Sequence, residues 1–194
     1  MTLRDDILSC TKCPVLVSAR TNAVPAFVGK NYVKGKGLAL FAEAPGADED
    51  KLGIPMVGRA GKLMDALLIQ AGMSRDYVLI LNRIRCQPIR NRIQDFPDAV
   101  LSCDEWTQKE LTEYDPRVVV CCGNTAMRAV FGVTSNITST RHTVRSTGDE
   151  FTYGARLYTA TWHPSAVLRA GGLGSEMAKQ SVSDLALAKE LLNA

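Results

Sequence analysis

Four of the six cysteines have the spacing and neighbours of a metal site. Cys10 and Cys13 form a C-x2-C pair, while Cys86 and Cys103 each lie beside polar or charged residues. The other two cysteines end the apolar run 118–122 and are expected to be buried and unreactive. Four converging thiolates could hold zinc or an iron–sulfur cluster. Zinc ribbons usually carry two C-x2-C pairs, so the single pair leans toward iron–sulfur; a chance pair with two unrelated thiols is the alternative.

A second group of residues combines a carboxylate, an amide and an imidazole, side chains that serve acid–base and hydrogen-bond chemistry. Glu43 precedes the turn 44–46, Asn82 lies near the end of the next apolar run, and His163 precedes Pro164. Taken singly, each also fits a structural role, as a cap, a strand-end amide or a buried histidine. Their positions relative to the secondary structure decide between these interpretations.

Apolar runs alternate with helical periodicity along the chain. We expect buried strands at 37–44, 77–84, 117–123 and 156–162, and helices at 60–72, 97–114, 124–132 and 181–192. Asn124 is the expected cap of its helix. Three of the four strands are apolar throughout, which is typical of a parallel sheet covered on both faces. The sequence therefore predicts an α/β fold, three-layer α/β/α, with a four-stranded, mostly parallel central sheet.

Ligands of such sheets bind beyond the carboxyl ends of the strands. Glu43, Asn82 and His163 are therefore expected at one edge of the sheet, together with the Gly-Asn pair 123–124. The glycine-rich segment 53–61 should lie there too, where its glycines would let the backbone approach a ligand closely. The chain has no G-x-G-x-x-G, G-K-[ST] or G-x-S-x-G motif. The sequence therefore does not support dinucleotide binding, nucleoside-triphosphate binding or esterase activity.

Length and composition are those of an ordinary globular chain. The 194 residues are expected to form a single domain, 1–194, and 46% hydrophobic with 22% charged residues excludes a disordered chain, a collagen or a coiled coil. The apolar run 118–122 is too short to cross a membrane. The N-terminus carries acids where a secretion signal has basic residues, so a cytoplasmic location is expected.

The distribution of charge says more than the net charge of +3. Residues 7–42 hold five basic residues and no acid, and residues 77–94 hold four arginines and no acid. A fold that gathered these stretches would have a positive face suited to phosphate groups. Scattered, solvated charges are the alternative.

Six motifs extend from the first cysteine to about Arg169 and are specific only in combination. They are Cys10-x2-Cys13; Glu43-Ala44-Pro45-Gly46-x-x-Glu49-Asp50; Gly53-x-Pro55-x-Val57-Gly58-x-Ala60-Gly61; Asn82-x-x-x-Cys86-x-Pro88-x-x-Asn91-Arg92 with Cys103; Gly123-x-x-Ala126; and His163-Pro164-Ser165. Together they resemble the uracil-DNA glycosylase superfamily, and are most similar to its family-4 branch.

The resemblance implies a four-iron, four-sulfur cluster on Cys10, Cys13, Cys86 and Cys103. Such a cluster would tie the N-terminal segment 1–20 to the core and act structurally rather than as an electron carrier. The family fold, a parallel four-stranded sheet between helices, agrees with the fold expected from the apolar runs.

The resemblance also implies removal of a base from DNA, for which the base must leave the stack and enter a pocket. His163 would donate to the base O2, where negative charge collects, and Asn82 would read the N3 and O4 edge. Glu43 would position or activate water. The expected base-binding residues are Ala44, Pro45, Gly46, Met56, Asn82 and His163.

Residues expected to contact the DNA itself flank this pocket. They are Arg90, Arg92, Ser165, Leu168 and Arg169. Val167 or Leu168 would act as a wedge between bases, and Arg169 would contact a phosphate.

The sequence departs from the family pattern at several positions. Met56 stands where family-4 enzymes have a phenylalanine that stacks on uracil, and Ala42 replaces a glycine. An Arg-Gly pair appears as Arg141-His142, so His142 is a candidate phosphate contact, second catalytic group or exposed bystander. One branch attaches covalently to DNA through a histidine in an inserted basic loop, which is missing between Asn82 and Cys103, so that activity is not expected.

These observations predict a monomeric, cluster-bearing hydrolase that cleaves uracil from single- or double-stranded DNA. One alternative is the same fold acting on another or modified base, because Met56 replaces the stacking phenylalanine. Another is a non-catalytic DNA-binding or sensor module. Retention of Glu43, Asn82 and His163 together argues against the second alternative.

Overall fold

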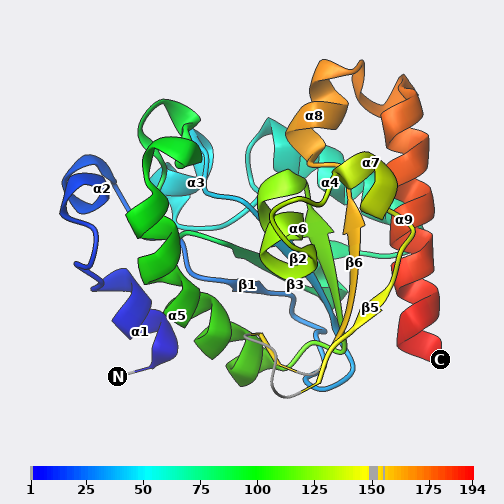
Figure 1. Ribbon diagram of the computed structural model, residues 1–194, viewed down its shortest axis with the longest axis horizontal. Helices are drawn as coiled ribbons and strands as arrows, with labels where there is room; N and C mark the ends of the chain where they lie inside the picture. The colour runs from blue at the N-terminus through cyan, green and yellow to red at the C-terminus, as the bar shows by residue number, and fades with distance from the viewer. Residues whose placement is uncertain (1, 149–152, 155) are drawn as a thin grey trace.

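The computed structural model describes residues 2–148, 153–154 and 156–194 (Figure 1). The helices are α1 (Leu3–Leu8), α2 (Pro14–Ala19), α3 (Ala47–Leu52), α4 (Arg59–Gln70), α5 (Pro97–Tyr114), α6 (Asn124–Phe131), α7 (Ile137–Thr140), α8 (Pro164–Arg169) and α9 (Glu176–Asn193). The 3-10 turns are η1 (Arg75–Tyr77), η2 (Ile89–Asn91), η3 (Ile93–Asp95) and η4 (Gly172–Gly174). The strands are β1 (Phe27–Val28), β2 (Leu38–Ala42), β3 (Val78–Asn82), β4 (Val118–Cys122), β5 (Arg145–Ser146) and β6 (Leu157–Thr161).

The strands form one sheet in the order β1-β3-β2-β4-β6-β5. Its centre consists of the four predicted strands, all parallel, and this part of the expected fold is confirmed. The predicted strand number is wrong, since the described residues hold six strands. The additional β1 and β5 are two-residue antiparallel edges, too short to produce a periodic signal in the sequence.

Both faces of the sheet are buried, which explains why three of the four central strands are almost entirely apolar. On β2, Leu38 and Leu40 contact the apolar side of α4 and α9, whereas Ala39 and Phe41 belong to the cluster with α5, α6 and α7. Neighbouring side chains of a strand point to opposite faces, and every central-strand position except the partly buried Leu157 is buried. The three-layer α/β/α prediction is confirmed.

Helix ends differ from the expected ones for local reasons. α9 begins at Glu176 rather than 181, because the Ser175 hydroxyl accepts the amide of Ala178 at 3.2 Å and caps the helix. Asn124 is not the cap of α6: Gly123 occupies that position, and Asn124 instead accepts the amide of Ile137 at 3.2 Å. None of the described helices has the length and apolar character needed to cross a membrane.

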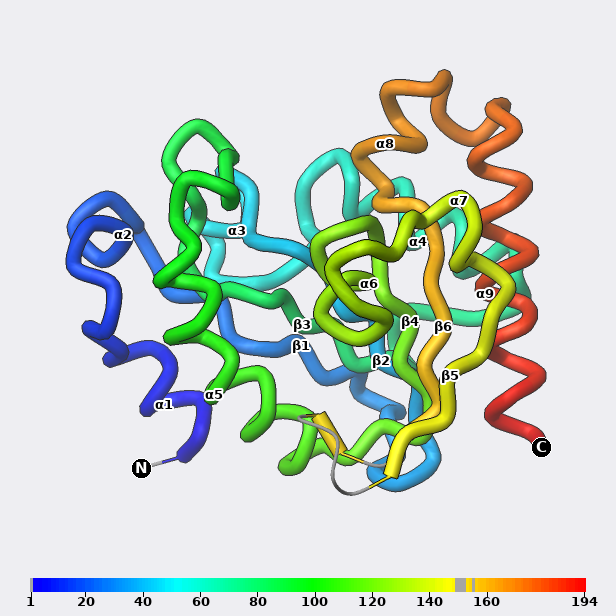
Figure 2. Tube along the Cα trace, in the orientation of Figure 1, coloured from blue at the N-terminus to red at the C-terminus, as the bar shows by residue number. Residues whose placement is uncertain are grey.

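The N-terminal helices α1 and α2 lie beside α5, although α5 is far from them in the sequence (Figures 1 and 2). A separate hydrophobic cluster joins them, in which Ile7 and Leu16 pack with Ile84, Cys103 and Trp106. This cluster brings the first twenty residues next to the segment that follows β3.

Candidate active site

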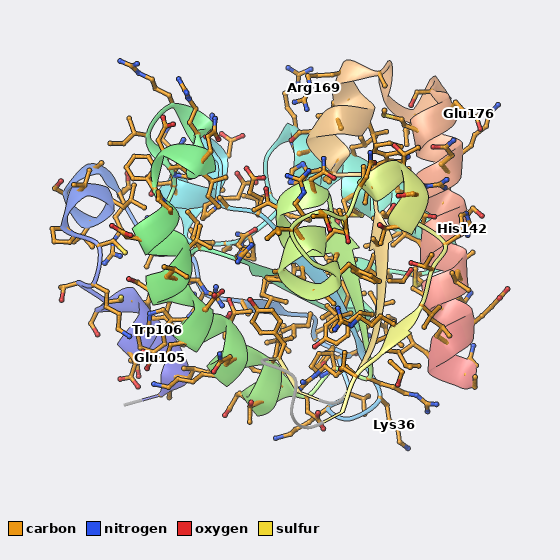
Figure 3. The ribbon with its side chains drawn as sticks, in the orientation of Figure 1. Lys36, Glu105, Trp106, His142, Arg169 and Glu176 are labelled. Carbon is orange, nitrogen blue, oxygen red and sulfur yellow. The ribbon has the colours of Figure 1, made fainter. Side chains whose placement is uncertain are left out.

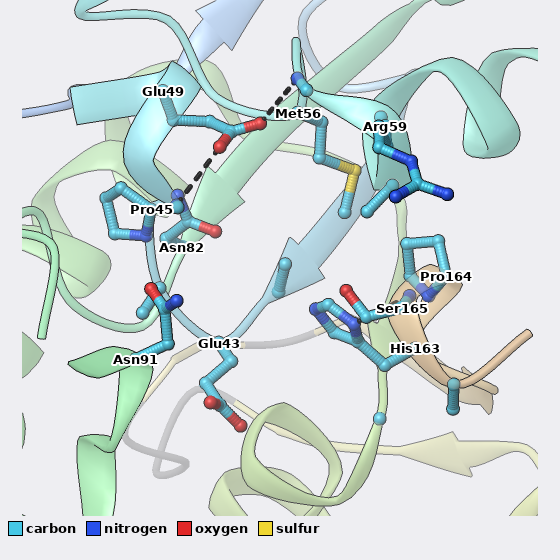
Figure 4. A pocket seen from close by; sticks show the side chains of 18 of the residues that line it. Glu43, Pro45, Glu49, Met56, Arg59, Asn82, Asn91, His163, Pro164 and Ser165 are labelled. Atoms are coloured by element: carbon cyan, nitrogen blue, oxygen red, sulfur yellow. Dashed lines mark hydrogen bonds between the residues drawn. The ribbon is translucent and has the colours of Figure 1, made fainter. Parts of the chain in front are cut away.

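A pocket of about 670 Å³ opens at the carboxyl ends of the central strands. Glu43 follows β2, Asn82 ends β3, and His163 comes shortly after β6; all three line the pocket (Figure 4). The parallel register places Ala42 beside Asn82, so Glu43 and Asn82 leave the sheet as neighbours. The predicted meeting of carboxylate, amide and imidazole at one edge is therefore what the fold produces.

Asn82 is a buried side-chain amide whose NH2 donor has no acceptor among the described residues. Its side chain is 3% exposed, and its Nδ2 has no hydrogen-bond partner among the described residues. Buried polar groups are nearly always hydrogen-bonded, because an unmade bond costs about 1–3 kcal/mol. An amide kept unsatisfied at a pocket wall is a ready donor for a ligand acceptor.

A buried ion pair supports Asn82 from behind. Arg85 is 2% exposed and pairs with Glu110 of α5. It also donates to the main-chain carbonyl of Asn82 at 2.5 Å. Glu110 also accepts the amide of Ala26 at 2.6 Å. The buried pair of Arg85 and Glu110 therefore links β3, α5 and the edge of the sheet behind the pocket.

His163 is held in one orientation by the helix that it caps. Its Nδ1 accepts the amide of Ser165 at 3.2 Å, at the start of α8. In the neutral ring the proton must then lie on Nε2, which leaves Nε2–H as a donor for a ligand. Burial lowers the pKa of His163, and the nearby Glu43 carboxylate opposes this shift in part. The neutral donor form is therefore favoured at neutral pH.

Glu43 is oriented by the helix that follows β4. The Thr125 hydroxyl of α6 donates to Glu43 Oε2, and Arg83 donates to the Thr125 carbonyl at 3.1 Å. Glu43 is half-buried and lines the pocket, and Thr125 engages one of its two carboxylate oxygens.

The glycine-rich segment also lies at the pocket, as expected. Met56 is 7% exposed and lines the pocket, with Gly58 and Gly61 next to it. A Cβ on Gly61 would lie 1.9 Å from the Met56 carbonyl oxygen, so the first turn of α4 packs against the backbone of this segment. This is the close approach for which glycine is needed.

Among the expected base-binding residues, all six line the pocket: Ala44, Pro45, Gly46, Met56, Asn82 and His163. The expected DNA contacts divide. Ser165 and Arg169 line the pocket, and Arg169 points outward from α8 (Figure 3). Arg90 and Arg92 are exposed on the segment after β3, where Arg92 pairs with Asp95 at 3.2 Å.

Of the two residues offered as a wedge between bases, Val167 does not fit that role. Val167 is fully buried against the α4 and α9 side of the core, because it lies on the inner face of α8. Leu168 is only partly buried, although it also packs against that core. Of the two candidates, Leu168 alone has exposed surface.

The four predicted ligand cysteines come together in one hydrophobic cluster. Cys86 and Cys103 are buried in it, and Cys10 and Cys13 pack against it. Burial raises the pKa of Cys103 to about 11, and it raises the pKa of Cys13, to which Cys86 and Cys10 add. No three His, Cys, Asp or Glu side chains in the described part of the chain converge closely enough to hold a single metal ion.

Donors surround the sulfur atoms of this group. Arg20 donates to Cys86 Sγ at 3.1 Å, and the Trp106 indole donates to Cys10 Sγ at 3.3 Å. Such N–H groups stabilise thiolate charge, and soft sulfur ligands suit iron–sulfur centres and zinc. The residues present therefore fit the implied cluster. Cys121 and Cys122 lie in β4 and are fully buried in the two clusters on either face of the sheet, so they are core residues as expected.

His142 lies away from the pocket, beside α9 (Figure 3). Its Nε2 is 3.2 Å from Oδ1 of Asp184, a fully buried carboxylate that also binds Arg141 and Thr161. The exposed-bystander interpretation is nearest to this arrangement, although the side chain has a partner. Thr161 ends β6, so the bonds of Asp184 to Thr161 and Arg141 support the strand that leads to His163, while His142 adds a partly exposed contact from the surface.

Several pocket residues carried no role in the sequence interpretation. Glu49 accepts the amides of Val57 at 2.9 Å and Gly58 at 2.8 Å, and the amide of Gly46 at 3.1 Å. It therefore ties the turn after β2 to the glycine-rich segment (Figure 4). The signal was present, as an acid three residues after the helix cap. Arg59, Asn91 and Trp162 also line the pocket.

Comparison with known proteins agrees with the motifs. A family model described as the uracil DNA glycosylase superfamily matches residues 31–186. A Type-4 uracil-DNA glycosylase of Archaeoglobus fulgidus is 35% identical over 84% of this chain and 80% of its own length. One of Thermotoga maritima is 32% identical over 96% of this chain and 91% of its own length.

A Type-5 uracil-DNA glycosylase of Pyrobaculum aerophilum is also similar, at 26% identity over 82% of this chain and 79% of its own length. Identity to the two Type-4 proteins is higher, in line with the resemblance of the motifs to the family-4 branch. With a family model over most of its length and relatives above 30% identity, the chain belongs to the uracil-DNA glycosylase superfamily.

Proposed function

We propose that this protein is a DNA glycosylase that hydrolyses the N-glycosidic bond of a uracil turned out of the DNA. The names of its Type-4 relatives support this activity. The observation that carries it is the unsatisfied Asn82 amide, which faces a pocket shared with Glu43 and His163. A flat polar base with adjacent acceptors and donors is the kind of ligand that would satisfy that amide.

In this proposal the three side chains divide the chemistry. The bond between C1′ and the base nitrogen breaks, its electron pair moves onto the base, and the sugar becomes oxocarbenium-like. The His163 Nε2–H donates to the base O2, where the charge develops, and Asn82 bonds the N3 and O4 edge. Glu43 orients the water that attacks C1′ and accepts its proton.

DNA is the proposed partner, held through its backbone around the pocket. Arg169 on α8 and the exposed Arg90 and Arg92 after β3 supply cations for phosphates. Leu168 is the proposed wedge, since its exposed part lies on the same short helix as Arg169. Arginines close to a pocket suit a nucleotide that must leave the duplex.

A four-iron cluster on Cys10, Cys13, Cys86 and Cys103 is part of the proposal. The shared hydrophobic cluster and the N–H donors from Arg20 and Trp106 support it. When bound, such a group would join α1 and α2 to α5 through thiolate bonds.

A base panel tests the function. Single-turnover cleavage is measured on oligonucleotides that contain uracil or one of several other and modified bases, with undamaged DNA as the control. Cleavage of uracil above all others supports the proposal. Cleavage of a different base favours the altered-substrate alternative, and DNA binding without any cleavage favours the non-catalytic module.

Met56 is the position at which the altered-substrate alternative can be tested. A methionine covers a base but adapts to different shapes, whereas an aromatic ring sets the thickness of the pocket. If the pocket is relaxed, Met56→Phe should raise the rate on uracil and lower it on larger bases. A base preference that does not move would remove this alternative.

A further inference from the structure

The backbone of Met56 has a conformation that a residue with a side chain rarely adopts. Its φ is +51°, in the left-handed region. Residues other than glycine persist there only when surrounding contacts hold them, and such strain often lies at functional sites. Met56 also lines the pocket, so its backbone conformation decides which way the methionine side chain points.

Arg75 holds the carbonyl side of this residue. Its Nη1 donates to the Met56 carbonyl at 2.8 Å, and its Nη2 donates to the Pro55 carbonyl at 2.6 Å. Two parallel bonds from one guanidinium fix the orientation of both peptide planes. Arg75 itself is fixed by Asp65 of α4, at 3.3 Å, and by the ring of Phe27, 4.5 Å from its guanidinium carbon.

Glu49 holds the amide side of the same turn. It accepts the next two amides along the chain, those of Val57 and Gly58. The segment is therefore clamped by a cation on its carbonyls and by a carboxylate on its amides. Gly61 closes the clamp, since its Cα faces the Met56 carbonyl with no room for a side chain.

We propose that Arg75 is a positioning residue for base selection: it holds Met56 in the left-handed conformation that turns the methionine side chain onto the base. This inference rests on the proposed function. Arg75 lies on η1, ahead of β3, and is not among the pocket-lining residues, so it would act only through Met56.

The expected effect follows from the populations of the two backbone states. Without its clamp, Met56 relaxes to ordinary φ values, and only a fraction of molecules presents the complete pocket. The equilibrium for inserting the base into the pocket falls in proportion to that fraction. For a residue with the usual strain of a left-handed conformation, the loss is about tenfold or more. DNA binding outside the pocket is unaffected.

A double-mutant cycle tests the proposal. The variants are Arg75→Ala, Met56→Gly and the combination of both, compared in single-turnover cleavage of uracil at saturating enzyme. Arg75→Ala should lower the rate about tenfold, with unchanged affinity for DNA that carries an abasic site. In the Met56→Gly background the same change should have little further effect, because glycine has no side chain to position. Arg75→Lys should restore part of the rate.

Asp76→Ala is the matched control, since Asp76 lies on the same η1 turn and, among the residues that the structure describes, its side chain pairs only with exposed Lys30, at 2.9 Å. Equal losses from Arg75→Ala in both backgrounds, or no loss in either, would overturn the proposal. If the parent protein cleaves no base, the proposed function fails. A crystal structure of Arg75→Ala then tests separately whether Arg75 holds the backbone conformation of Met56. A positive φ retained at residue 56 in that crystal would also overturn it.

Discussion

At the scale of single residues, the pocket presents the side-chain amide donor of Asn82, for which the described residues supply no acceptor. Asn82 is enclosed by its strand and by Arg85, yet its Nδ2 is unbonded within the described residues. His163 complements it with an Nε2–H whose position follows from the Nδ1 bond to Ser165. These two donors are prearranged, so they need no reorganisation when charge develops on a ligand.

The first prediction concerns these donors. Asn82→Ala and His163→Ala should each lower the single-turnover cleavage rate by about 10²–10³, because each removes one preorganised donor. Affinity for uncleaved DNA should change little, since the contacts strengthen only as the bond breaks.

Matched controls for this prediction are available in the same chain. Asn193→Ala removes an exposed amide from the end of α9, and His142→Ala removes the second histidine, outside the pocket. Both should cleave at close to the parent rate. Parent-like rates in Asn82→Ala and His163→Ala as well would place the active site elsewhere.

The second prediction concerns pH. Burial lowers the pKa of His163 below its usual 6.5, so the unfolded chain binds this proton more readily than the folded one. His163 therefore makes stability fall as the pH drops through 6.5 toward the folded-state pKa. Thermal unfolding is measured from about pH 7.5 down to about pH 5, the range in which histidine titrates. Over this range the parent should lose more stability than His163→Ala. Identical pH slopes for the two proteins would contradict the prediction.

At the scale of elements, the end of β4 and the loop after β6 are in direct contact. Gly123 has φ +86°, and a Cβ placed there would lie 2.7 Å from the Cβ of His163. The glycine thus lets α6, which carries Thr125, start directly beside the histidine loop. Packing at this point positions two of the three proposed catalytic side chains.

The third prediction tests that contact. Gly123→Ala should displace His163 and lower the cleavage rate by about tenfold or more, since small misplacements of catalytic groups are costly. Gly132→Ala is the matched control, because Gly132 ends the same helix with φ +103° and a Cβ there meets nothing within 4 Å. Both variants should lose stability through backbone strain, but only Gly123→Ala should lose activity. Equal rates for the two variants would show that the contact is unimportant.

At the scale of the whole molecule, the N-terminal segment is joined to the α/β core by the hydrophobic cluster that includes the four predicted ligand cysteines. Cys10 and Cys13 lie between α1 and α2, Cys86 lies in the segment after β3, and Cys103 lies in α5. A centre bound there would link parts of the chain that are far apart in sequence, so its loss should reach beyond the immediate site.

The fourth prediction concerns this centre. The purified protein should be brown and contain iron, with the broad visible absorption of thiolate-bound iron–sulfur centres. Serine in place of Cys10, Cys13, Cys86 or Cys103 should remove the colour and lower the unfolding temperature. Cys121→Ala, in β4, should keep the colour. Metal analysis that finds zinc and no iron would contradict the iron–sulfur assignment.

The fifth prediction concerns the charged surface around the pocket. DNA affinity should fall steeply with salt, and Arg90→Ala should lower the slope of log affinity against log salt by about 1, as one phosphate contact is lost. Lys36 lies at the opposite end of the molecule from Arg169, so Lys36→Ala should leave the slope unchanged (Figure 3). An affinity that does not respond to salt would exclude backbone contacts at these positions.

The sequence alone determined the four central strands, the parallel arrangement and the edge at which Glu43, Asn82 and His163 meet. These features depend on local signals, since a buried strand is a short apolar run and its carboxyl end is read directly from the chain. The two-residue edge strands β1 and β5 were missed because they carry no such pattern.

Only the tertiary structure decided how these side chains are held. Thr125 meets Glu43 across 82 residues of sequence, and Arg85 meets Glu110 across 25. The left-handed backbone of Met56, the guanidinium of Arg75 on its carbonyl, and the place of His142 beside Asp184 likewise follow from how helices pack on the sheet. Local sequence encodes where a strand ends, but the partner of a long polar side chain is set by packing between distant segments, for which a single sequence carries no local signal.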